Sequence, residues 1–246
     1  LAENRYIAED AIDNIKVTYQ EYTPIIKTEE ATLDSSPNVH KKTKTNVVSD
    51  RKFSYGNPKE AFKKADEIIK LKIEYPRNSC TPLEGFIVQS NYNPSEKSYT
   101  VHSNFQGPFS LHSVISRSLN VNENKLRLLS NQDSGGSFGI KQAILPMIVL
   151  TCLASRISGK NIKWVEDRIE HLTAASSATN RVTTIKAAVK RNGEILALDH
   201  DQIDDVGAYL RAPEPASLYR MHGNLSGAYL VKNISCRNRV VLTNKT

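Results

Sequence analysis

The sequence predicts an α+β fold, because segments with helical and strand periodicity alternate along the chain and a tight hairpin turn joins two of the strands. The hairpin signal is the pair Asn192-Gly193, which separates two apolar segments. The expected helices cover residues 8–13, 57–69, 110–119 and 141–158. The expected strands cover residues 15–19, 69–73, 86–89, 98–102, 125–129, 162–165, 182–190 and 194–201.

The first residues of the chain form a small unit that needs a partner. Ala8–Asp13 combines helix formers with acidic residues, and the alternation over residues 15–19 is typical of a strand. One helix and one strand have a single apolar face, which requires another layer to cover it. We therefore expect residues 1–26 to be the tail of another domain. The chain starts at Leu1 without a methionine or a signal-type segment, so we expect an internal piece of a longer protein.

The main domain is expected to begin at Asn57, after a polar linker over residues 27–56. Asn57 offers a capping side chain, Pro58 takes the first helical position, and Glu60 follows three residues after the cap. This order is typical of a helix start. Residues 57–246 then form one α+β unit.

The composition excludes several classes of protein. With 246 residues, of which 39% are hydrophobic, the chain can bury a core. The longest apolar run, Ala143–Ala154, contains Pro146 and is shorter than the roughly 20 residues that cross a bilayer, so we expect a buried helix and no membrane partner. The three cysteines lie far apart without CxxC spacing. This argues against a disulfide scaffold, a zinc ribbon or an iron–sulfur cluster in this chain, and it favours a cytoplasmic location.

Charged residues indicate no specific site. The net charge is +7, but basic residues are spread along the chain, and the densest run, residues 40–44, has no interleaved aromatic residue. We interpret it as a solvated loop and not as a nucleic-acid site. The six histidines have no ligand spacing, so no metal-ligating residue is predicted. Asp204 and Asp205 would point to opposite faces of a strand, and we expect them in a surface turn.

The most informative local feature is a glycine turn between the expected strand 125–129 and helix 141–158. Adjacent glycines let the backbone approach a bound group, and the start of a helix offers unpaired N–H donors. The spacing of Gly135–Gly139 matches neither a dinucleotide fingerprint nor a phosphate loop. A plain tight turn is the competing interpretation. Phe138 at the apex argues against it, because a large aromatic residue is poorly buried in such a place.

A second candidate follows the expected strand 98–102. There the chain continues through Ser103 and Asn104 to Gln106, whose amide side chain could meet a ligand at the strand end. The alternative is that Ser103 or Asn104 only caps the following helix.

Four stretches together carry a resemblance to the molybdenum hydroxylases, the family of xanthine dehydrogenase, aldehyde oxidoreductases and the large subunit of aerobic carbon monoxide dehydrogenase. Ser134–Lys141 resembles the family's Gly-Gly-Gly-Phe-Gly motif, and Thr81–Gly85 its Glu-Pro region. Ser103–Gln106 is similar to its Ser-Thr-Gln segment, and Lys163–Arg168 to its Trp-x-Glu-Asp-Arg stretch. The opening residues 5–11 resemble the end of the hammerhead domain that precedes the cofactor domain. The resemblance therefore covers almost the whole chain.

The resemblance implies a molybdopterin cofactor with molybdenum, with the cytosine dinucleotide form as one option. By this resemblance the amide of Gln106 would hydrogen-bond an oxygen ligand of the metal, and the turn formed by Gly136, Ser137, Phe138 and Gly139 would line the cofactor. The implied partners are the remaining half of the molybdenum subunit, iron–sulfur and flavin (FAD) subunits, and a small-molecule substrate. Residues 1–26 would be the tail of a hammerhead-like domain, and residues 57–246 the N-terminal portion of a molybdopterin-binding domain.

Departures from the family pattern limit which substrate and which catalytic residues are predicted. Ser137 replaces the third glycine of the motif, and Ile140 stands where a glycine or asparagine is common. Gln142 takes the place at which the xanthine branch has a glutamate that orients purines, which disfavours a purine substrate. The chain ends at Thr246, before the segment that carries the family's general-base glutamate, so no catalytic residue is predicted in this segment.

The resemblance implies an oxidoreductase that hydroxylates or oxidises an aldehyde or related small substrate, with water as the oxygen source and electrons passing to iron–sulfur and flavin units. A carbon monoxide dehydrogenase large subunit is the alternative within the family. From another class, a non-catalytic basic module that docks acidic subunits or nucleic acid remains an alternative, based on the net charge.

Overall fold

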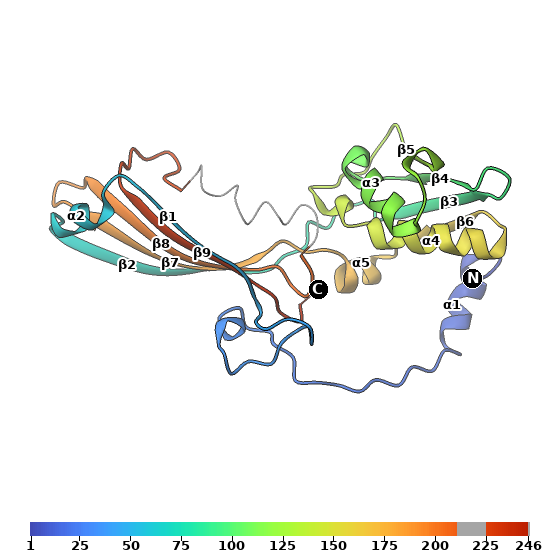
Figure 1. Ribbon diagram of the computed structural model, residues 1–246, viewed down its shortest axis with the longest axis horizontal. Coiled ribbons are helices and arrows are strands. Elements are labelled where there is room, and N and C mark those ends of the chain that lie inside the picture. Colours follow the sequence, from blue (N-terminus) through green and yellow to red (C-terminus); the bar gives the residue numbers. More distant parts are fainter. Residues whose placement is uncertain (211–224, 246) are drawn as a thin grey trace. The chain divides into compact units, whose positions relative to one another are not determined.

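The computed structural model describes residues 1–210 and 225–245, and its mixture of helices and open sheets confirms the α+β fold (Figure 1). The chain divides into two compact units. Unit 1 consists of Leu1–Thr23, Glu84–Gly135 and Ile144–Glu166. Unit 2 consists of Pro24–Leu83, Gly136–Ala143 and Asp167–Thr246. Each core is therefore closed by stretches that are distant in sequence.

Unit 1 contains a four-stranded sheet in the order β5-β4-β3-β6. Its strands are β3 (Ile87–Asn93), β4 (Ser98–Ser103), β5 (Leu126–Ser130) and β6 (Ile162–Val165). Strand β3 is antiparallel to β4 and β6, whereas β5 is parallel to β4. Val88 and Val101 are fully buried, because alternate residues of each strand face the helical layer.

Three α-helices belong to unit 1: α1 (Arg5–Ile12), α3 (Pro108–Leu119) and α4 (Leu145–Ser158). Residues Ile140–Ser158 are long and apolar enough to cross a membrane by length and composition. In the structure α4 packs on β3 and β6 and buries Ile148 and Cys152, so the predicted buried helix is confirmed for this face. Leu150 and Ile157 on α4 are exposed.

Unit 2 is built on a five-stranded sheet in the order β1-β9-β8-β7-β2. The strands are β1 (Val47–Tyr55), β2 (Glu67–Tyr75), β7 (Asn180–Val189), β8 (Ile195–Asp205) and β9 (Ile234–Val241), which run side by side in Figure 1. Strands β8 and β9 are parallel, and every other neighbouring pair is antiparallel. Gly193 takes a φ of +89° between β7 and β8, which confirms the predicted Asn-Gly hairpin.

Two short helices complete unit 2: α2 (Pro58–Lys63) and α5 (Arg168–Ala174). The predicted start of α2 is confirmed, because the side chain of Asn57 accepts a hydrogen bond from the Glu60 N–H at 3.4 Å. One-turn 3-10 helices also occur, at Glu30–Thr32 and Ile140–Gln142 in unit 2 and at Glu123–Lys125 in unit 1.

Several local predictions were wrong. Residues 15–19 form no strand among the described residues and are exposed, since no neighbouring strand pairs with them there. The polar stretch 27–56 contains β1, which pairs with β9 and so obtains its hydrogen bonds from residues far along the chain. The helix expected over 57–69 ends at Lys63, because β2 already starts at Glu67. The domain boundaries at residues 26 and 56 stay predictions.

Candidate functional site

The part of the glycine turn that lies in unit 2, Gly136–Gly139, presents Phe138 to the solvent. Phe138 is 75% exposed and has a φ of +55°, a backbone conformation that non-glycine residues rarely adopt. Gly136 and Gly139 have φ values of +95° and +97°. A Cβ added at Gly139 would meet nothing within 4 Å, so open space lies beside the backbone there. The turn therefore has a strained backbone with open space beside it, which is the arrangement expected of a segment that binds a ligand.

The N–H donors after the turn are arranged differently from the prediction. The segment that follows is the 3-10 helix Ile140–Gln142, and α4 begins only at Leu145 in unit 1. The N–H of Ile140 donates to the carbonyl of Ser137 at 3.2 Å, and the N–H of Lys141 donates to the Ser137 hydroxyl at 3.2 Å. These two donors are therefore used inside the turn and help to fix its shape.

The predicted Ser103–Gln106 segment belongs to unit 1. The amide of Asn104 donates to the carbonyl of Gly85 at 2.8 Å and accepts from the N–H of Ile87 at 3.1 Å, while Ser103 donates to the Ile87 carbonyl at 2.6 Å. The capping alternative is wrong, because the residue before α3 is Gly107 and no side chain caps that helix. Gln106 follows this fixed segment and is exposed.

Two motif carboxylates are structural in unit 1. Glu166 is buried and accepts from the N–H of Phe86 at 2.9 Å. Glu84 accepts from the N–H of Gly135 at 3.1 Å, and a Cβ on Gly135 would lie 2.4 Å from the Glu84 Cβ. Gly135 is therefore required for close packing. Neither carboxylate is placed as a general base by these contacts.

In unit 2, Arg168 links two of the motifs. Its guanidinium donates to the carbonyl of Pro82 at 3.0 Å and to that of Leu83 at 2.8 Å. Arg168 is the first residue of α5, which starts here because Asp167 and Glu170 form a capping box. The spacing of these two acids is the sequence signal that could have placed Arg168 at a helix start.

The motif stretches are shared between the two units. Unit 1 holds Glu84 and Gly85, Ser103–Gln106, Gly135 and Glu166, and unit 2 holds Thr81–Leu83, Gly136–Gly139, Asp167 and Arg168. In unit 1 the bonds given above join Glu84 to Gly135 and Asn104 to Gly85, and in unit 2 they join Arg168 to Pro82 and Leu83. The convergence of Gln106 and Phe138 on one ligand stays a prediction.

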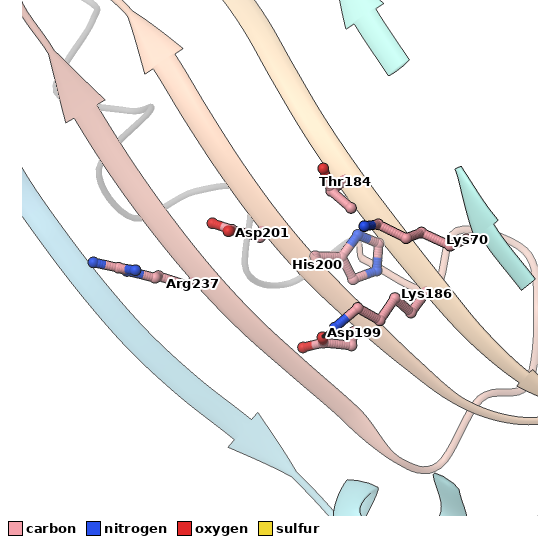
Figure 2. Close-up of a pocket in the computed structure, with 7 residues that line it drawn as sticks. All are labelled: Lys70, Thr184, Lys186, Asp199, His200, Asp201 and Arg237. Carbon is pink, nitrogen blue, oxygen red and sulfur yellow. Dashed lines mark ion pairs between the residues drawn. The ribbon is translucent and has the colours of Figure 1, made fainter. Parts of the chain in front are cut away.

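A separate pocket of about 360 Å³ lies on the five-stranded sheet. Figure 2 shows its lining side chains, which come from β2, β7, β8 and β9: Lys70, Thr184, Lys186, Asp199, His200, Asp201 and Arg237. Lys186 pairs with Asp199 at 3.5 Å, and Asp201 pairs with Arg239 at 2.6 Å. None of the predicted site residues lines this pocket, and its charges are typical of a solvated cross-strand ladder.

Two buried carboxylates of this sheet are also structural. Asp204 and Asp205 are fully buried at the end of β8, so the predicted surface turn was wrong. Burial raises the pKa of Asp204 against the opposing effect of Arg181, which binds it at 2.6 Å. Asp205 accepts from the hydroxyl of Thr243 at 2.7 Å. Within residues 1–210 and 225–245, no cluster of histidine, cysteine and acidic side chains could hold a metal ion.

Comparisons with known proteins agree with the motifs. A family described as the molybdopterin cofactor-binding domain matches residues 39–246. The chain is similar to the 6-hydroxypseudooxynicotine dehydrogenase complex subunit gamma of Paenarthrobacter nicotinovorans, with 30% identity over 100% of this chain and 30% of that protein. It is 29% identical to the carbon monoxide dehydrogenase large chain of Hydrogenophaga pseudoflava, over 100% of this chain and 32% of the relative.

Solved structures show the same similarity. The quinoline 2-oxidoreductase of Pseudomonas putida 86 matches with a TM-score of 0.91 and 27% identity, over 99% of this chain and 31% of that chain. The chain thus spans about a third of the length of these relatives.

Proposed function

The chain belongs to the molybdopterin cofactor-binding domain family, and from this premise we propose that it is part of the molybdenum-binding subunit of an oxidoreductase. The proposed reaction is the hydroxylation or oxidation of an aldehyde or related small substrate, with water as the oxygen source. The observation that carries this proposal is the exposed Phe138 turn, whose flanking Gly139 leaves open space beside the backbone.

The residues present fit a bulky, oxygen-rich cofactor. An exposed aromatic ring and a glycine backbone without a Cβ can lie against a flat ring system, and the exposed amide of Gln106 can donate to an oxygen. We propose that Gly136, Ser137, Phe138 and Gly139 line the molybdopterin and that Gln106 orients an oxygen ligand of the metal. When bound, this cofactor supplies the redox chemistry, and the protein supplies position and electrostatics.

The chain's own residues bind and orient in this proposal, and none is assigned as a catalytic base. The carboxylates of the motif stretches have structural partners: Glu84 with Gly135, Glu166 with Phe86, and Asp167 with Glu170. The neutral Gln142 offers no charge to a purine, which favours an aldehyde-type substrate. A carbon monoxide dehydrogenase large subunit is the alternative, and the similarity to such a chain supports it.

The proposed partners are the remaining half of the molybdenum subunit and subunits that carry iron–sulfur clusters and FAD, in the cytoplasm. The cytosine dinucleotide form of the cofactor belongs to the same proposal. The competing basic interaction module has less support, because several cations of the five-stranded sheet are paired, as Arg237 is with Asp50 at 2.7 Å and Lys72 with Glu29 at 2.8 Å.

Metal and pterin analysis of the assembled protein tests the proposed function. We expect molybdenum and a pterin to copurify with the complex, and oxidation of an aldehyde to reduce an artificial electron acceptor. A complex without molybdenum would overturn the proposal. Salt-dependent DNA binding by such a metal-free complex would instead support the basic module.

A further inference from the structure

Arg168 holds one short segment of unit 2 with both arms of its guanidinium. The two bonded acceptors, the carbonyls of Pro82 and Leu83, are consecutive in the chain. Such a fork is strong for a side-chain contact, because the donor is charged and its planar geometry fixes both acceptors at once. A lysine cannot reproduce this geometry, since its ammonium is a single point of charge.

Helix α5 contacts the same segment a second time. The buried His171 lies one turn after Arg168, and its Nε2 is 3.5 Å from the hydroxyl oxygen of Ser79. The Ser79 hydroxyl also accepts from the N–H of Thr81 at 3.3 Å. Helix α5 therefore holds residues 79–83 near both ends.

This segment in turn contacts the Phe138 turn. The thiol of Cys80 donates to the carbonyl of Phe138 at 3.4 Å. A Cβ built on Gly136 would lie 3.5 Å from the Pro82 Cβ and 3.1 Å from the Phe138 ring, so the two chain segments pack closely. A displacement of residues 79–83 would therefore also displace the Phe138 turn.

Both segments store backbone strain. Thr81 and Phe138 have φ values of +36° and +55°, and neither is a glycine. Residues persist in this region only when their surroundings hold them there. The contacts from α5 supply such a constraint next to Thr81, and the Cys80 contact transmits it to Phe138.

We propose that Arg168 is a positioning residue that fixes the Phe138 turn through residues 79–83. The role of Arg168 toward a bound cofactor rests on the proposed function. The link from Arg168 through residues 79–83 to the Phe138 turn does not. Arg168 thereby sets the backbone that would line the cofactor without touching it.

Hydrogen exchange in the full-length polypeptide with its partners tests the link. The amides of Ile140 and Lys141 report on the turn, because both donate to Ser137. In Arg168→Ala we expect their exchange to be about tenfold faster, with a smaller, several-fold increase in Arg168→Lys. Arg191→Ala is the matched control, since Arg191 is an exposed arginine of the same unit. In Arg191→Ala the amides of Ile140 and Lys141 should exchange as fast as in the unchanged protein.

Alkylation of Cys80 gives a second readout, followed on its own peptide by mass spectrometry. Cys80 is exposed, whereas Cys152 and Cys236 are buried, so its labelling rate should rise in both Arg168 variants. If Arg168→Ala does not fold, Arg168→Lys decides. Unchanged exchange at Ile140 and Lys141 in a folded variant overturns the proposal, and so does an increase that extends equally over β7 and β8.

Molybdenum content separates this inference from the proposed function. If the unchanged complex holds molybdenum, Arg168→Ala should retain less molybdenum per mole of folded complex. If the unchanged complex holds none, the proposed function fails, and the exchange data still decide whether Arg168 positions the turn.

Discussion

Gly139 is the residue at which one added methyl group tests the candidate site. Its φ of +97° disfavours any side chain, but a Cβ would meet no neighbouring atom. We predict that Gly139→Ala costs about 1 kcal/mol of stability and that the added methyl and the relaxed turn strongly reduce molybdenum retention. Metal analysis of the purified complex measures the second effect.

Gly193 provides the matched control for this prediction. Its φ of +89° and the open space around its Cβ position are the same type of environment, but it lies in the β7–β8 hairpin. Gly193→Ala should lose a similar amount of stability and keep its molybdenum. Equal metal loss in both variants would show that Gly139 has no special role.

From the buried His200 we predict that the stability of the chain depends on pH. It is 6% exposed, neither ring nitrogen has a hydrogen-bond partner among the described residues, and burial lowers its pKa against the opposing charge of Asp199. A histidine with a lowered pKa binds fewer protons in the folded state than in the unfolded state. Its stabilising contribution is therefore complete above the unfolded pKa, about 6.5, and is lost as the pH falls through the lower folded value.

Urea unfolding between pH 5 and 7 measures this effect. Asp204 lies in the same strand, and its raised pKa makes stability fall as the pH rises, which opposes the effect of His200. The contribution of His200 is therefore measured by comparing the protein with a His200 variant. We predict that His200→Phe flattens the decline toward pH 5. An identical pH profile in His200→Phe would contradict the assignment.

Among the elements, those with local signals were predictable and those that depend on distant partners were not. The hairpin at Asn192-Gly193 and the helix start at Asn57 were read from two to four adjacent residues, and both occur. Strand β1 was missed because its sequence is polar and its pairing partner, β9, lies almost 190 residues away. Residues 15–19 have a strand pattern without a strand to pair with among the described residues, so alternation alone was insufficient.

Strand β2 gives a prediction at the scale of an element. It is one of the two edge strands of the five-stranded sheet, and Leu71 on it is 56% exposed. An exposed apolar edge strand favours association between chains. We predict that Leu71→Lys reduces aggregation of the chain and changes the free energy of unfolding by less than about 0.5 kcal/mol.

Light scattering at rising protein concentration checks this prediction. Lys70→Leu on the same strand is the reverse substitution and should increase scattering. If both variants scatter as the unchanged chain does, the edge is not the site of association.

The molecule as a whole combines two units whose chain segments interleave. The chain passes from one unit to the other at five positions. Three of them, between Leu83 and Glu84, between Gly135 and Gly136, and between Glu166 and Asp167, lie inside motif stretches that were recognised from the sequence. The order and spacing of the motifs were enough to identify the family, but the division into units depends on contacts between distant residues and could not be read from local patterns.

Gln106 carries the prediction that concerns the assembled enzyme. It stands after a segment fixed by Ser103 and Asn104, so its backbone is held while its side chain is exposed. If its amide donates to an oxygen at the metal, Gln106→Ala should lower kcat by about tenfold or more, since one preorganised donor is lost from a water-excluded site. Steady-state kinetics of the assembled complex, normalised to its molybdenum content, measure this. Gln89→Ala, which removes an exposed glutamine from β3 in the same unit, should leave kcat unchanged. A structural change in unit 1 that only lowers the amount of loaded enzyme leaves the normalised kcat unchanged. Equal kcat values for both variants would therefore place Gln106 away from the reacting atoms.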